Sequence, residues 1–76
     1  MIVVKYNGAG NYRDLNRGQK YNVLAVSIPA RGNVFIRVVD ASEEDYLYRL
    51  ECFDVIEGRD ELFGIIDHNE KCEIVV

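Results

Sequence analysis

Apolar and polar residues alternate in short runs along most of this chain, a pattern typical of β-strands. Residues 1–57 show no apolar stripe with the 3.6-residue spacing of an amphipathic helix. Runs rich in β-branched and aromatic residues recur instead, separated by polar or glycine-containing turns. This pattern predicts five strands, with a single 3₁₀ turn before the last, at residues 2–6, 19–28, 34–40, 45–49 and 53–57.

Segment 19–28 is the longest expected strand, and its middle holds four consecutive apolar residues. Because successive side chains of a strand point to opposite faces, this run places apolar groups on both faces. A strand that changes its buried face in this way usually bends or bulges between two sheets. Pro29 and Gly32 then interrupt the strand.

Segment 45–49 places Tyr46 and Tyr48 on one side of a strand and Leu47 on the other. Two arrangements stay open. Either Leu47 faces the core and the tyrosines face outward, or the tyrosines face inward and Leu47 is exposed between charged neighbours. Since two tyrosines bury more area than one leucine, we expect at least one tyrosine to be partly buried with its hydroxyl at the rim.

The C-terminal residues 58–76 begin with a polar linker and continue with two apolar runs, 62–67 and 72–76. These runs predict a hairpin, or one strand that joins the edge of the main sheet. A short helix is the alternative, which Gly64 and the β-branched pair after it disfavour. A hairpin alone is marginal in water, so we expect this extension to pack on the main body or on a partner. An apolar terminal strand is also an edge through which a homodimer could form.

Two stretches carry a resemblance to a known group of proteins: "LNRGQKYNV" at 15–23, and a tyrosine-rich strand that ends in "FDVI" at 53–56. They resemble short uncharacterised bacterial and phage-type proteins with an SH3-like barrel, although Lys20 lies one place beyond the lysine of that pattern. The resemblance covers residues 1–57. It implies an all-β fold, a small SH3-like five-stranded barrel over 1–57 followed by a C-terminal β-hairpin or strand extension over 58–76.

Length and charge narrow the classes of function. At 76 residues and 49% apolar composition, the chain suits one small globular domain. It has neither a signal-peptide core nor a long apolar span, so we expect a cytoplasmic protein without membrane contact. Its 13 acidic and 9 dispersed basic residues, net charge -4, disfavour nucleic-acid binding. Arg13, Arg17 and Lys20 could still form a local basic patch. An acidic surface suits a basic protein partner.

The sequence offers little catalytic or metal-binding chemistry. Cys52 and Cys72 form no CxxC pair, and His68 completes no recognisable zinc spacing, so we expect no metal. Small buried thiols are our main interpretation of both cysteines, with a disulfide or a reactive thiol as open alternatives. No nucleophile–base pair is suggested, and the loop "GAGNYR" lacks the features of a phosphate-binding loop. We therefore expect neither enzymatic activity nor a cofactor.

Aromatic residues and adjacent arginines remain as candidates for a partner-binding site: Tyr12, Arg13, Tyr46, Tyr48 and Arg49. Aromatic residues line the peptide groove of SH3 domains, but this chain has no Trp, which argues against recognition of proline-rich peptides. We predict a non-enzymatic protein-interaction module, an adaptor or an inhibitor of a larger protein such as phages and mobile elements encode. The alternatives are an assembly protein that oligomerises through 58–76 and a nucleic-acid-associated SH3-like barrel.

Overall fold

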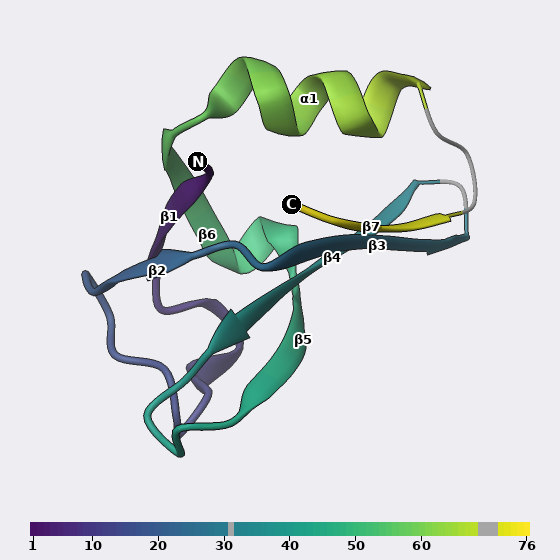
Figure 1. The fold of residues 1–76 in the computed structure, drawn as a ribbon. Coiled ribbons are helices and arrows are strands. Elements are labelled where there is room, and N and C mark those ends of the chain that lie inside the picture. The colour runs from purple at the N-terminus through teal and green to yellow at the C-terminus, as the bar shows by residue number, and fades with distance from the viewer. Residues whose placement is uncertain (31, 69–71) are drawn as a thin grey trace.

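A computed structural model describes residues 1–30, 32–68 and 72–76, with Cys72 described by its backbone alone. The fold is mostly β, with two antiparallel sheets and one helix (Figure 1). One sheet has the order β2-β1-β6 and is built from β1 (Val3–Tyr6), β2 (Lys20–Asn22) and β6 (Phe53–Glu57). The other has the order β5-β4-β3-β7 and is built from β3 (Ala25–Ala30), β4 (Asn33–Val39), β5 (Asp45–Arg49) and β7 (Cys72–Val75). Two 3₁₀ turns, η1 (Ala9–Asn11) and η2 (Leu50–Cys52), and the helix α1 (Arg59–His68) complete the described elements.

Four of the five predicted strands are present as single strands, but the predicted SH3-like barrel is wrong. Among the described residues the two sheets stay open and separate. The reason lies in the expected strand 19–28, which divides into β2 and β3. The backbone N–H of Val23 donates to Ile2 O in one sheet (2.9 Å), and that of Leu24 donates to Arg37 O in the other (2.8 Å). The chain thus changes sheets within one residue, which confirms the predicted bend.

A groove of about 390 Å³ separates β2 from the end of β4, where a closed barrel would have continuous strand pairing. Lys20 and Asn22 of β2 line one side of the groove, and Val39 and Ala41 line the other. Among the described residues β2 pairs with β1 alone and lies at the edge of its sheet. The two sheets are therefore not joined on this side.

The predicted strand at 62–67 is also wrong, because these residues belong to α1. Leu62, Ile65 and Ile66 follow the i, i+3, i+4 spacing of a helical face, and all three pack against the core. Leu62 is fully buried. This burial outweighs the low helix propensity of Gly64 and the β-branched pair after it. Residues 72–75 do form a strand: β7 joins the sheet edge by pairing with β3.

One hydrophobic core joins both sheets and the helix. Its fully buried members come from every layer: Ile2, Val4, Val26, Ile36, Val38 and Leu62. The C-terminal extension therefore contributes to the same core as the first strand. Cys52 is also buried there, and burial followed by the nearby charge of Glu51 raises the pKa of its thiol. No helix in the described part of the chain is both long and apolar enough to cross a membrane.

Gly58 and Gly64 give a matched test of the connection into α1. Gly58 has φ +76°, and an added Cβ would meet the backbone of Met1 and Ile2, whereas one at Gly64 would meet nothing within 4 Å. We expect Gly58→Ala to lower the free energy of unfolding by about 2 kcal/mol or more. Gly64→Ala should raise it by about 0.5–1 kcal/mol, because alanine favours the helix. Urea unfolding measures both, and a neutral Gly58→Ala would contradict the described connection.

Candidate functional site

Aromatic rings gather where the loop 7–19 meets the β4–β5 hairpin. Phe53 lies at their centre, with the ring centroids of Tyr6, Tyr21 and Tyr48 at 5.7, 6.3 and 6.4 Å. Tyr12 packs edge-to-face on Tyr48 at 5.0 Å. Edge-to-face pairs of this kind add to the stability that area burial provides. Two of the predicted site residues, far apart in the sequence, are thus in direct contact.

The phenol hydroxyls of two buried tyrosines fix the loop that carries Tyr12. The Tyr6 hydroxyl donates to Ala9 O (2.6 Å) and accepts the backbone N–H of Tyr12 (3.1 Å). The Tyr21 hydroxyl accepts the backbone N–H of Asn16 (2.9 Å). The loop backbone is therefore held from inside the core at three points. This fixes the position of the Tyr12 ring before any partner arrives.

Asp40 is the buried polar residue that anchors the other side of the site. Its carboxylate accepts hydrogen bonds from the Tyr48 hydroxyl (2.6 Å), from the backbone N–H of Ser42 (2.9 Å) and from the Ser42 hydroxyl. Burial alone would raise the pKa of Asp40, but the hydrogen bonds from Ser42 and Tyr48 outweigh it and hold that pKa below the usual value. The carboxylate is consequently ionised at neutral pH.

Tyr48 is half-buried, as expected for at least one of the tyrosines of this strand. Burial, then the hydrogen bond to Asp40 and the charge of that carboxylate, raises the pKa of the Tyr48 phenol far above its ordinary value. The hydroxyl therefore stays protonated and serves as a donor to Asp40. Its ring packs between Tyr12 and the core residue Phe53.

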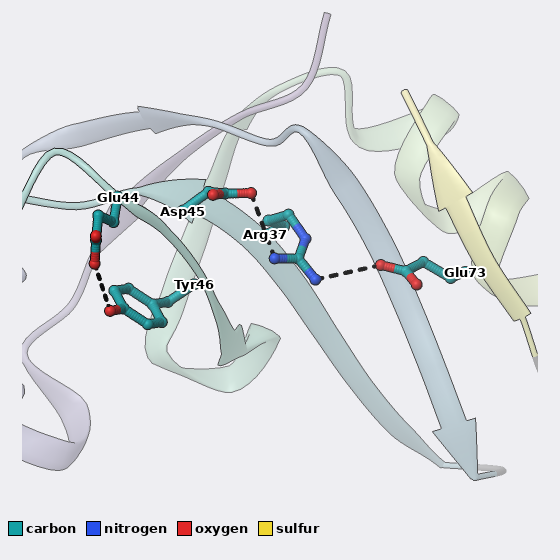
Figure 2. Close-up of polar contacts among 5 residues, drawn as sticks. All are labelled: Arg37, Glu44, Asp45, Tyr46 and Glu73. Carbon is teal, nitrogen blue, oxygen red and sulfur yellow. Dashed lines mark hydrogen bonds and ion pairs between the residues drawn. The ribbon is translucent and has the colours of Figure 1, made fainter.

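Tyr46 is 48% exposed, and its hydroxyl donates to Glu44 Oε2 at 2.6 Å (Figure 2). That hydrogen bond and the charge of Glu44 raise the pKa of Tyr46, with further contributions from burial and from the charges of Asp40 and Asp14. Carboxylates from the loop and from the hairpin thus act on the same phenol. Three carboxylates, those of Glu44, Asp40 and Asp14, therefore lie near enough to act on the Tyr46 phenol.

The structure brings together three of the five predicted site residues. Tyr46 and Tyr48 share the core-facing side of β5, opposite Val38 and Ile36, and Tyr48 contacts Tyr12. We call these three tyrosines the aromatic corner. Arg49 lies on the opposite side of β5, with its guanidinium 5.2 Å from the Phe35 ring centroid. Arg13 is exposed next to Tyr12 and forms no ion pair within the described residues.

Asp40 and Ser42 were not among the predicted site residues, although the sequence contains a signal for them. An aspartate two residues before a serine can accept the serine backbone N–H and so close a turn. The structure contains this turn. The contact of Tyr48 with Tyr12 has no comparable local signal.

The described residues contain no group of three or more His, Cys, Asp or Glu side chains that could hold a metal ion. His68 is exposed at the end of α1. The raised pKa of Cys52 keeps its thiol protonated and poorly nucleophilic. The proposed pairing of Cys52 with Cys72 involves a side chain that lies outside the described residues.

Comparisons of the chain with protein-family models, with curated proteins and with solved structures give no match. The resemblance to SH3-like bacterial and phage-type proteins therefore receives no support from them. Any function has to be inferred from the chemistry of the surface.

The hydrogen bond from Tyr48 to Asp40 can be removed without removing the ring. We expect Tyr48→Phe to lower the free energy of unfolding by about 1–3 kcal/mol, because a buried carboxylate loses a donor. The exposed hydroxyl of Tyr46 gives the control, and Tyr46→Phe should change stability by no more than about 0.5 kcal/mol. Urea unfolding at pH 7 measures both.

The stability difference between wild type and Tyr48→Phe should also depend on pH. A carboxyl whose folded-state pKa is depressed stabilises the protein above its unfolded pKa of about 3.9, and this stability is lost as the pH falls through the folded value. The stability difference between wild type and Tyr48→Phe should therefore shrink as the pH falls below about 4. A difference that stays constant or grows would contradict the assigned hydrogen bond.

Proposed function

We propose that this protein is a non-enzymatic interaction module whose aromatic corner binds a basic segment of a partner protein. The observation that carries the proposal is the combination of exposed tyrosine rings with carboxylates at one corner. Tyr12 and Tyr46 are 40% and 48% exposed, and Glu44 is bonded to the Tyr46 hydroxyl. Aromatic faces attract Lys and Arg cations, and carboxylates form charge-assisted hydrogen bonds with them.

The charge distribution supports a cationic ligand. Asp14, Asp40 and Glu44 all contribute a negative field at the Tyr46 phenol. The guanidinium of Arg37 is turned away from this corner toward Asp45 and Glu73, on the other side of the sheet (Figure 2). The same negative field would repel nucleic-acid phosphates, which disfavours a nucleic-acid-associated function.

Preorganisation supports the proposal as well. The backbone of Tyr12 is held by the Tyr6 hydroxyl, and the Tyr48 ring is held between Tyr12 and Phe53. Rings that are already ordered lose little conformational entropy when a ligand binds. A small rigid surface of this kind fits an adaptor or an inhibitor that binds a larger protein by one short contact segment.

The proposal can be tested by titrating ¹⁵N-labelled protein at low salt with a short Lys/Arg-rich peptide and with an acidic peptide of equal length. We expect the basic peptide to shift amide signals of residues 12–14 and 44–48, and to bind more weakly as salt is raised. Tyr12→Ala and Tyr46→Ala should each weaken binding about three- to tenfold, the loss expected for one exposed cation–π contact.

Tyr46→Phe is the matched control, because it keeps the ring and removes the hydroxyl, and it should retain most of the binding. Equal binding of the acidic peptide would overturn the proposal. So would shifts that lie away from these segments, or alanine variants that bind as tightly as the wild type.

A further inference from the structure

We propose that the outer face of the four-stranded sheet is a homodimer interface, at which two copies of this chain pack face to face. The outer face consists of the side chains that point away from the core along its four strands: Ala25, Ser27, Phe35, Arg37, Val39, Asp45, Leu47, Arg49, Glu73 and Val75. Strand register places them together, because Arg37 lies opposite both Leu47 and Ala25, and Ala25 lies opposite Val75. One row of side chains therefore crosses all four strands.

The opposite face of this sheet is already covered. Val26, Ile36 and Val38 point inward and are fully buried. The core that they form also contains Leu62 of α1, and Figure 1 shows α1 running along β3 and β7. The helix therefore packs against the inner face. The outer face is more accessible: Ala25 at its centre is buried and Phe35 and Arg37 are partly exposed, but Val39, Leu47 and Val75 are exposed.

The outer face carries exposed apolar side chains. Val39, Leu47 and Val75 are 48%, 40% and 83% exposed. Solvent-facing strand positions normally carry polar residues, so exposed apolar side chains gathered around Arg37 on one face point to an interaction surface. Burial against another surface would remove these side chains from water.

The charges on this face favour a second copy as the occupant. Arg37 sits at the centre and pairs with Asp45 and with Glu73, each at 3.4 Å (Figure 2). Arg49 lies over the Phe35 ring. Two guanidiniums and two carboxylates give the face no net charge, although the chain carries -4. In a two-fold interface each charge meets a copy of the same surface, so a balanced face avoids self-repulsion.

Other occupants fit less well. A membrane-binding face would display an excess of Lys or Arg, whereas the two arginines of this face, Arg37 and Arg49, are matched by two carboxylates. A strongly charged protein partner would need a face with a net charge of opposite sign, and this face has no net charge.

The area needed for a stable dimer, about 800 Å² per copy, is about a sixth of the accessible surface of 4936 Å². One broad face of a molecule that measures 31 × 22 × 20 Å can supply it.

Sedimentation equilibrium of the full chain at about 10–500 μM tests this proposal. We expect the apparent mass to rise from 8.7 kDa toward twice that value. Leu47→Glu and Val75→Glu place a like charge on both copies and should each weaken the dimer at least tenfold. Ile56→Glu is the matched control, because Ile56 is 45% exposed on β6 of the other sheet, and it should leave the dimer unchanged.

Leu47 also distinguishes packing by this face from edge pairing through β7, since β5 and β7 are the two opposite edges of the sheet. If Val75→Glu disrupts the dimer and Leu47→Glu does not, the proposal is overturned in favour of edge pairing.

A wild-type apparent mass of 8.7 kDa at every concentration, or an Ile56→Glu control that dissociates equally, would overturn the proposal too. Circular dichroism checks that each variant is folded, and Leu47→Ala and Val75→Ala repeat the test if a charged variant is not. Val75→Glu should leave peptide binding at the aromatic corner unchanged, because Val75 lies on β7, at the edge of the sheet opposite β5, so the two proposals fail independently.

Discussion

The hydrogen bond between the Tyr48 hydroxyl and the buried carboxylate of Asp40 holds the side chain through which the β4–β5 hairpin contacts more distant parts of the chain. Asp40 closes the β4–β5 turn by accepting two hydrogen bonds from Ser42, and Tyr48 contacts both the core ring of Phe53 and the loop residue Tyr12. A buried charge is costly unless it is well paired, so this network fixes one arrangement of hairpin and loop.

The β5 strand separates two surfaces with different chemistry. Tyr46 and Tyr48 lie on its core-facing side, where the carboxylates of Asp14, Asp40 and Glu44 give a negative field. Its other side belongs to a face whose charges cancel internally. The first surface fits a cationic segment, and the second fits a copy of itself. Because the surfaces do not overlap, a dimer would present two aromatic corners to a larger partner and gain avidity.

The pattern of apolar residues was enough to locate the strand-forming segments of residues 1–57, and the apolar run in 19–28 predicted a change between sheets, although this segment forms two strands, β2 and β3, and not one. The barrel was predicted wrongly because closure depends on pairing between strands of the two sheets, which no local pattern encodes. The helix was only the alternative to a hairpin, because the 3.6-residue pattern of Leu62, Ile65 and Ile66 is short and its stability comes from burial in the core. Similarly, three tyrosines of the site were predicted by residue type, whereas Asp40 became recognisable only through its partners.

The most direct test of this account is a pH titration of the Asp40 side-chain carboxyl by ¹³C NMR, in the wild type and in Tyr48→Phe. The account predicts a wild-type pKa below the ordinary value for aspartate, and a higher pKa in the variant, where one donor to the carboxylate is lost. An ordinary or raised pKa in the wild type, or the same pKa in both proteins, would show that the Tyr48–Asp40 hydrogen bond does not organise the aromatic corner.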